Sequence, residues 1–338
     1  MTPRIARPGE SVDRMAALVA TMVSQFGLDL SGIRVLTEAA TGAYSATPVL
    51  AALAGADVVA LTRESRFGSV AEVTSATCSL ADRLGVASRI TISTERSPSL
   101  FADADIITNS GHVRPISGEY AEAVRPGTAL ALMFESWEIQ AGRDDLALDR
   151  LRARGVRIAG TNERHPNVDV FSYLGLMAVV QLADAGIPAY RTRVGLLCDN
   201  PFRTYVESGL TSSGATVRHA ESLKGISSPE IDVLLVALTP TGSSVLSGEE
   251  ILSLGRRQPA VPIVQFWGDI DRAAAATAGV PVWPVESPGP GHMGVLPSRM
   301  GPDATVRLQA GGLKVGQVLL IDPEKRSLED VEYLDELR

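Results

Sequence analysis

The sequence IRVLTEAATGAYSATPVLAALAGADVVAL, residues 33–61, predicts a strand, a helix and a second strand in direct succession. Residues 33–37 are a short and mostly apolar run of strand length. A loop of small residues follows at 38–47, and a helix is expected over 48–54, because Pro48 suits a first helical turn. The second apolar strand is expected at 58–61. Strand, helix and strand in this order form the basic unit of a parallel sheet.

The same alternation continues along the chain. Further strands are expected at 90–92, 106–108, 129–134, 156–159, 194–197, near 217, and at 231–238, 263–266 and 280–283. A long apolar helix at 168–185 is expected to lie buried at the junction of two lobes. We therefore predict an α/β protein with two Rossmann/flavodoxin-like doubly wound parallel-sheet domains and an inter-domain cleft. The expected domains are a flavodoxin-like substrate domain at 1–165 and a Rossmann-like domain at 166–304. An open alternative adds the C-terminal segment 305–338 to the first domain.

Composition narrows the classes of partner. The chain has 338 residues and a formal net charge of -8 at pH 7, which disfavours nucleic acid because phosphate binding needs a basic surface. The two cysteines, Cys78 and Cys198, lie far apart in the sequence and predict neither a disulfide framework nor a cysteine-based zinc site. There is no signal-peptide pattern and no run of about 18 apolar residues, so we expect a cytoplasmic protein without a membrane partner.

Several stretches resemble landmarks of the D-2-hydroxyacid dehydrogenase family. The segment DIITNS, 105–110, resembles the strand that leads into the family's loop for the substrate carboxylate. The segments LTPTG, 238–242, and VQFWGDID, 264–271, resemble two later family motifs in the correct order. The resemblance implies a substrate domain around an inserted dinucleotide domain, NAD or NADP as cofactor, and a homodimer. It also implies oxidation or reduction of a small anionic metabolite, similar to a 2-hydroxy or 2-oxo acid.

The same comparison shows departures at the cofactor motif. In the family, the first strand of the dinucleotide domain is followed by G-x-G-x-x-G, whose glycines let the pyrophosphate approach. Here those positions are Cys198, Asn200 and Arg203, whose side chains would crowd a dinucleotide in the usual pose. The acidic residue expected after the second strand is missing, and Arg218 and His219 stand nearby.

The family's catalytic residues are also changed. The position of its arginine is Trp267, and its glutamate corresponds to Glu286. Its histidine is expected near Gln309, where no histidine occurs. These departures weigh against hydride transfer, whereas the order of the landmarks favours it.

Polar residues follow the predicted strands, at the edge where open parallel sheets bind ligands. The predicted catalytic residues are His112, Arg114, Arg164, His165, Glu286 and His292, and the predicted substrate contacts are Asn109, Ser110, Glu135 and Trp137. A histidine suits proton transfer and an arginine suits a carboxylate. An alternative without function stays open for these residues: the polar ones lie in exposed surface loops, and Trp137 packs on the core. The four histidines lack metal-ligand spacing, so no metal site is predicted.

The predicted cofactor contacts lie in the second half of the chain. They are Asn200, Pro201, Phe202, Arg203, Thr239, Trp267 and Asp269. A helix start with a nearby arginine favours an anion. The first half offers a similar loop at 41–45, and Thr62, Arg63 and Ser65 after the second strand could hold a phosphate, with a solvated turn as the alternative.

Two functions are therefore open at this point, and the first is favoured because the resembled fold usually carries that chemistry. One is a divergent NAD(P)-dependent oxidoreductase acting on a small anionic metabolite in the cleft. The other is a non-redox enzyme, such as a lyase or transferase, or a ligand-binding regulator that has lost the dinucleotide glycine motif.

Overall fold

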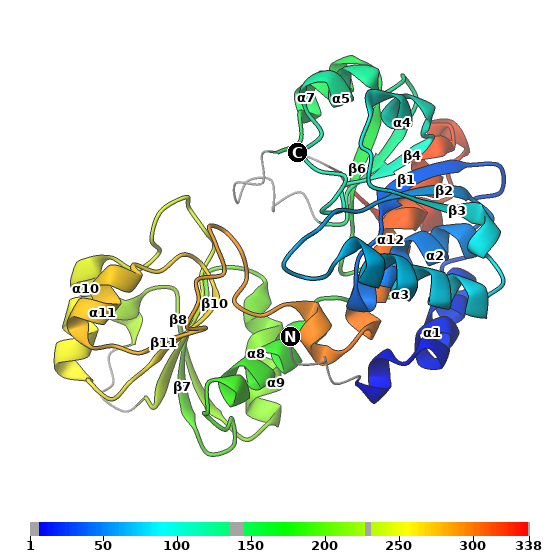
Figure 1. Cartoon of the computed structure of the whole chain (residues 1–338). Helices are drawn as coiled ribbons and strands as arrows, with labels where there is room; N and C mark the ends of the chain where they lie inside the picture. Colours follow the sequence, from blue (N-terminus) through cyan, green and yellow to red (C-terminus); the bar gives the residue numbers. More distant parts are fainter. Residues whose placement is uncertain (1–6, 135–144, 227–230, 337–338) are drawn as a thin grey trace. The chain divides into compact units, whose positions relative to one another are not determined.

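The computed structural model describes residues 7–134, 145–226 and 231–336, which form two compact units. Unit 1 contains residues 7–134, 145–170 and 301–336, and unit 2 contains residues 171–226 and 231–300. Each unit has its own sheet with helices packed against it (Figure 1). The predicted α/β class with two doubly wound parallel sheets is confirmed. The domain boundaries predicted at 165/166 and 304/305 stay a proposal.

The sheet of unit 1 has seven strands in the order β12-β6-β5-β4-β1-β2-β3. They are β1 (Arg34–Glu38), β2 (Asp57–Leu61), β3 (Ile90–Ser93), β4 (Ile106–Thr108), β5 (Ala129–Ala131), β6 (Arg157–Thr161) and β12 (Leu334–Asp335). All pairs are parallel except β12, which runs antiparallel to β6. The strand order reverses between β1 and β4. Open α/β sheets bind ligands at such a reversal, outside the carboxyl ends of the strands.

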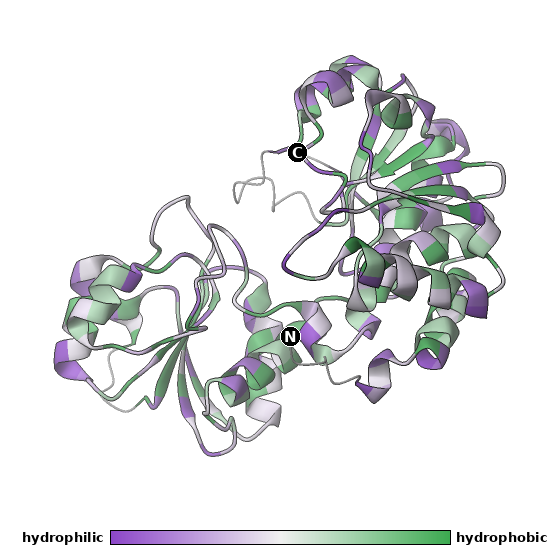
Figure 2. Ribbon diagram, viewed as in Figure 1, coloured by the Kyte–Doolittle hydropathy of each residue, from purple (hydrophilic) through white to green (hydrophobic). Residues whose placement is uncertain are grey.

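Alternate residues along β1 and β2 enter two different cores. Val35 and Val58 pack with one group of helices, whereas Leu36 and Leu61 pack with another, as the side-chain period of a strand requires. The first group is α1 (Val12–Gln25), α2 (Ala46–Leu53), α3 (Val70–Arg83) and α12 (Asp303–Leu320). The second is α4 (Pro98–Asp103), α5 (Gly118–Ala123) and α7 (Leu148–Ala153). Figure 2 shows the apolar strands of this sheet between helices with hydrophilic outer residues.

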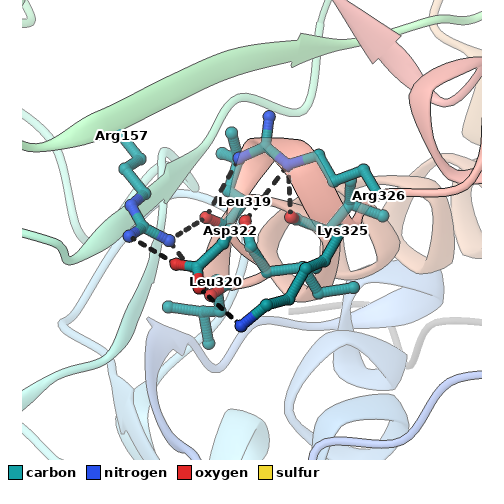
Figure 3. A network of polar contacts seen from close by, with 8 residues as sticks. Arg157, Leu319, Leu320, Asp322, Lys325 and Arg326 are labelled. Carbon is teal, nitrogen blue, oxygen red and sulfur yellow. Dashed lines mark hydrogen bonds and ion pairs between the residues drawn. The ribbon is translucent and has the colours of Figure 1, made fainter.

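Two arginines close the carboxyl end of α12, where helix carbonyls lack partners. Arg157 on β6 donates to the carbonyls of Leu319 and Leu320, at 2.8 and 3.0 Å (Figure 3). Arg326 donates to the carbonyls of Val318 and Ile321, at 3.1 and 3.2 Å. The chain then continues through η6 (Pro323–Lys325) and α13 (Leu328–Val331) to β12. These bonds tie the last segment of the chain to unit 1.

The sheet of unit 2 has five parallel strands in the order β11-β10-β9-β7-β8. They are β7 (Arg193–Leu197), β8 (Thr216–Ala220), β9 (Val233–Ala237), β10 (Ile263–Trp267) and β11 (Val282–Trp283). The main helices are α8 (Tyr173–Asp184), α9 (Phe202–Ser212), α10 (Gly248–Arg257) and α11 (Arg272–Ala278). Here the strand order reverses between β7 and β9, which gives this unit its own crossover point.

Helices α8 and α9 touch through two glycines. A Cβ atom added at Gly209 would lie 2.4 Å from the Cα of Gly175, so neither position has room for a side chain. The absence of side chains at these two positions lets the backbones of α8 and α9 approach each other closely.

Two helices differ from their predicted extents. Helix α8 begins at Tyr173 and not at Val168, because Asp169 has a φ of 45°, which a helix does not allow. The apolar stretch 313–320 predicts a helix of about that length, but α12 already begins at Asp303. The prediction that the helix at 168–185 lies between the lobes stays a prediction. Within the described residues, no helix has the length and apolarity needed to cross a membrane. Cys78 and Cys198 are both free.

Candidate functional site

The crossover point of unit 1 is built around Glu38, the last residue of β1. Glu38 is only 7% exposed, and its Oε2 accepts a hydrogen bond from the backbone N–H of His112, at 3.0 Å. A Cβ atom added at Gly111 would lie 3.3 Å from the same oxygen, so the loop after β4 passes close over the carboxyl group. Burial raises the pKa of Glu38, and hydrogen bonds from the His112 and Gly111 backbones partly oppose that rise. A carboxyl group thus lies buried at the edge where ligands bind.

A chain of buried hydroxyl groups supports the loop after β4. The Oγ1 atoms of Thr37 and Thr108 lie 2.8 Å apart, and Thr108 Oγ1 lies 2.7 Å from Ser110 Oγ. Asn109 Oδ1 accepts from the backbone N–H of Met133, at 2.8 Å. Asn109 and Ser110, predicted as substrate contacts, are therefore placed at this crossover, and their described bonds hold the loop in position.

Two polar atoms at this edge have no partner among the described residues. One is His112 Nδ1, which is buried, and the other is Thr62 Oγ1, on a residue only 3% exposed directly after β2. Burial lowers the pKa of His112, and the positive charge of Arg63 lowers it further. His112 is therefore neutral near pH 7 and has a ring nitrogen free for a proton or a hydrogen bond. Buried polar groups are normally paired, so these two atoms are available to bond a water or a ligand.

The other predicted residues of unit 1 are engaged elsewhere. Arg114 donates through Nε to Asp145 Oδ2, at 2.7 Å, and a second bond joins the same two side chains, so its charge is balanced within the chain. Arg164 is exposed in the loop after β6. His165 is 7% exposed and its ring stacks on Tyr333, with centroids 3.8 Å apart. Its Nδ1 accepts from the backbone N–H of Asn167, at 3.2 Å.

Burial also lowers the pKa of His165, against an opposing effect of Glu332 and Glu329. His165 thus holds the last segment of the chain in place through its contact with Tyr333. None of its described contacts is with His112. Glu135 and Trp137, predicted as substrate contacts, lie outside the described residues.

The turn between β7 and α9 is the usual place for a dinucleotide. Asn200 Oδ1 accepts from the backbone N–H of Phe202, at 3.1 Å, and Asn200 Nδ2 donates to the carbonyl of Ala237, at 2.7 Å. Asp199 Oδ1 accepts from the backbone N–H and the hydroxyl of Thr239, at 2.8 and 2.9 Å. The polar groups that join β7 to β9 are thus bonded to one another.

These residues do not fit a pyrophosphate in the usual pose. Pro201 has no N–H, and the N–H groups of Phe202 and Arg203 already have acceptors in Asn200. The carboxylate of Asp199 adds negative charge at this turn, where a helix start would otherwise attract an anion. Arg203 pairs with Glu207 on its own helix, at 3.3 Å. Burial raises the pKa of the neighbouring Cys198 thiol to about 11, so the thiol stays protonated.

One prediction for unit 2 was wrong. The acidic residue held to be missing after the second strand is present, since the exposed Glu221 directly follows β8. This is the position at which a carboxylate can hold a ribose diol. His219, just before it, uses Nε2 to contact the carbonyl of Cys198, at 2.7 Å.

The remaining predicted residues of unit 2 lie around β10 and the loop after β11. Trp267 is 3% exposed, and its Nε1 donates to the carbonyl of Gly291, at 3.1 Å, so its ring belongs to the core. Asp269 accepts from the backbone N–H of the same glycine, at 3.0 Å. Glu286 and His292 are exposed in the loop after β11. Gln309, near the expected place of a catalytic histidine, is buried on α12 of unit 1 and accepts from Thr47, at 2.9 Å.

Glu38 was not predicted as a site residue, and Thr62 was predicted only as part of a phosphate contact with a solvated turn as the alternative. The sequence offered one signal, because Glu38 directly follows the mostly apolar residues of the first predicted strand. A glutamate at such a position is rarely buried without a partner. In the described ranges, no three His, Cys, Asp or Glu side chains gather as potential metal ligands.

No protein-family model matches this chain, and no curated protein matches it. Solved structures do. A dipicolinate synthase chain from Bacillus halodurans is 12% identical, with a TM-score of 0.55 over 87% of this chain and 100% of that one. The dipicolinate synthase of Bacillus subtilis is 11% identical, with a TM-score of 0.51 over 84% and 95%. An NAD+-bound 3-phosphoglycerate dehydrogenase from Entamoeba histolytica is 10% identical, with a TM-score of 0.45 over 86% and 95%.

These likenesses bear out the predicted two-domain scaffold, and identities this low establish the fold alone.

Proposed function

We propose that this protein is a non-redox enzyme that transfers a proton on a small anionic metabolite at the crossover point of unit 1. One observation carries this proposal. The buried Glu38 carboxyl group accepts a hydrogen bond from the backbone N–H of His112, and the ring nitrogen Nδ1 of His112 has no partner among the described residues. Neutral His112 is the candidate base or acid. Glu38 is a positioning residue that holds the loop through its backbone N–H groups. Arg63, whose charge acts on His112, is the candidate anchor for the anion.

An isotope-exchange experiment tests the proton transfer without knowledge of the full reaction. The protein is incubated in D2O with a panel of small 2-oxo and 2-hydroxy acids, and deuterium incorporation at carbon is followed by NMR. We expect exchange into at least one acid, without any added nucleotide and with loss of the exchange in His112→Ala. If no acid exchanges, or if His112→Ala exchanges as fast as the parent protein, proton transfer at this crossover is wrong.

A second candidate function is the NAD(P)-dependent oxidoreductase that the family resemblance of the sequence implied. Glu221 favours it, because a carboxylate after the second strand suits a ribose. The turn from Cys198 to Arg203 opposes it, since its N–H groups are occupied. Titration of NADH and NADPH, followed by the fluorescence of the reduced ring, separates the two candidates. We expect no saturable binding.

Two variants sharpen that titration. If NADH or NADPH binds saturably and Glu221→Gln weakens that binding, the oxidoreductase becomes the supported function and the proposed one is wrong. Arg203→Gly then shows where the phosphates lie. If Arg203 holds a phosphate or carboxylate, its loss should weaken binding by about ten-fold or more, and if it only crowds the turn, binding should be unchanged or tighter.

A further inference from the structure

The loop between β2 and α3, residues 62–69, exposes an aromatic ring beside the crossover point of unit 1. We call it the β2 loop; it follows β2 at the carboxyl edge of the sheet (Figure 1). Its Phe67 side chain is 66% exposed, which is unusual for phenylalanine. An exposed aromatic residue on a disordered segment would mean little, so the order of the loop decides the argument.

The β2 loop is held by hydrogen bonds of its own. Ser65 and Gly68 exchange backbone bonds of 3.2 and 3.3 Å, and Ser65 Oγ accepts from the Phe67 N–H, at 3.2 Å. Thr41, in the loop after β1, donates to the Phe67 carbonyl, at 3.0 Å. A Cβ atom added at Gly68 would lie 2.8 Å from Thr41 Cγ2, so the two loops are packed closely. Phe67 is therefore presented from a fixed backbone, which lowers the entropy cost of a contact with a ligand.

The β2 loop carries two cations, one of them over the exposed ring. The guanidinium of Arg66 lies 4.8 Å from the centre of the Phe67 ring. Arg63 is exposed earlier in the same loop, and its charge acts on His112. The one acid of the loop, Glu64, accepts from the backbone N–H of Val70 at the start of α3, at 3.0 Å. Within the described contacts, neither Arg63 nor Arg66 has a carboxylate partner, so both cations are open to an anion.

We propose that the β2 loop recognises a flat aromatic ring that carries an anionic group, with the ring against Phe67 and the anion at Arg63 and Arg66. This inference rests on the proposed function and gives its substrate class. Two sources share this chemistry, an aromatic carboxylic acid and a nucleotide. The Thr62 hydroxyl, directly before Arg63 and unpaired among the described residues, offers one further hydrogen bond to such a ligand.

The test compares aromatic with aliphatic anions by calorimetry or thermal shift. The probes are dipicolinate, for which two of the structural neighbours are named, AMP, and the aliphatic dicarboxylate glutarate. We expect dipicolinate or AMP to bind more tightly than glutarate, and the tighter of the two identifies the source. Loss of stacking in Phe67→Ala should weaken the aromatic probe by about ten-fold, with glutarate unchanged and with Phe67→Tyr close to the parent protein.

Unit 2 contains a matched control. Tyr190 is 64% exposed, and the guanidinium of Arg191 lies 5.3 Å from the centre of its ring. Tyr190→Ala should leave the binding of every probe unchanged. If Phe67→Ala has no more effect than Tyr190→Ala, or weakens glutarate equally, ring recognition is wrong. A change of mass in Phe67→Ala by light scattering, without a change in affinity, would also overturn it in favour of a protein interface.

The same experiment separates this inference from the proposed function. Weaker binding of all anions in Arg63→Ala, with no effect of Phe67→Ala, removes the ring recognition and keeps an anion site. If Arg63→Ala also binds every probe as the parent protein does, the anion site of the proposed function fails with it.

Discussion

The two crossover points have the same topological position but use their polar groups in opposite ways. In unit 2, Asn200 and Asp199 are bonded to the strands and the helix that they connect. In unit 1, His112 Nδ1 and Thr62 Oγ1 are buried with no partner among the described residues, and Glu38 is buried with a raised pKa. Self-bonded groups stabilise a fold, whereas unpaired buried groups cost free energy unless a ligand pairs them.

This difference shows that a crossover point marks only a potential site. Whether it binds a ligand depends on whether its donors and acceptors are already used. By that criterion the turn of unit 2, which the family resemblance favoured, is closed to a phosphate in the usual pose. The crossover of unit 1 is the open one, and substitutions at the two points should differ in effect accordingly.

The largest effect is expected for His112→Ala. If His112 transfers the proton, the rate of deuterium exchange should fall by about 10²–10⁴-fold, as for other general acid–base residues. His219→Ala is the matched control, because His219 also lies at the carboxyl edge of a strand and bonds only the carbonyl of Cys198 in the described contacts. Rates from NMR should change in the first variant and not in the second. Equal losses in both would show that the two edges do not differ.

A loss of stability is expected for Asn200→Ala. The change removes the acceptor of the Phe202 N–H and the donor to the Ala237 carbonyl, and should cost about 1–3 kcal/mol. Urea unfolding followed by circular dichroism measures this cost. His112→Ala, measured in the same way, should cost less, since its Nδ1 bonds nothing among the described residues. A larger stability loss for His112→Ala would reverse the comparison.

Much of the fold follows from the sequence because apolar runs and helix ends are local signals. The strand at 58–61 and the buried strand at 231–238 are predicted by their composition, and the structure has β2 and β9 there. The extent of α8 is less predictable, since the left-handed backbone of Asp169 that precedes it has no signal in an apolar run.

The site is harder to predict, because it depends on which side chains face each other. Glu38 was assigned to a loop, but it ends β1 and meets a backbone N–H group 74 residues later. His165 was predicted as a catalytic residue, and its ring stacks on Tyr333 near the other end of the chain, a contact that the sequence does not display. Glu221 was missed because the end of β8 is fixed by its pairing with β7, which the sequence does not display.

A pH-dependent difference between the crossovers is expected for Glu38→Gln. Burial raises the pKa of Glu38 above its ordinary 4.5, so its contribution to stability is complete below pH 4.5 and is lost as the pH rises through the folded-state pKa. The stability of the parent protein relative to Glu38→Gln should therefore fall as the pH rises.

Asp232→Asn in unit 2 is the control with the opposite sign. Hydrogen bonds from the side chain and backbone of Arg193 lower the pKa of Asp232 below its ordinary 3.8, so its contribution is present above that value and is lost as the pH falls. Urea unfolding between about pH 2.5 and pH 8 should show the two slopes. Slopes of the same sign would mean that Glu38 is not held as a buried carboxyl group.

The smallest effect is expected for Thr62→Val, which keeps the side-chain shape and removes the unpaired hydroxyl. Since no described bond is lost, the variant should be as stable as the parent protein or more stable by about 0.5–1 kcal/mol. Thr161→Val is its control, because Thr161 is also buried but donates to the carbonyl of Leu132, at 2.7 Å, and should cost about 1 kcal/mol. A stabilised Thr62→Val that binds the anionic probes more weakly would show that this hydroxyl is kept for a ligand. A destabilised Thr62→Val would show that the hydroxyl has a structural partner, and the unpaired groups of unit 1 would then be no guide to its site.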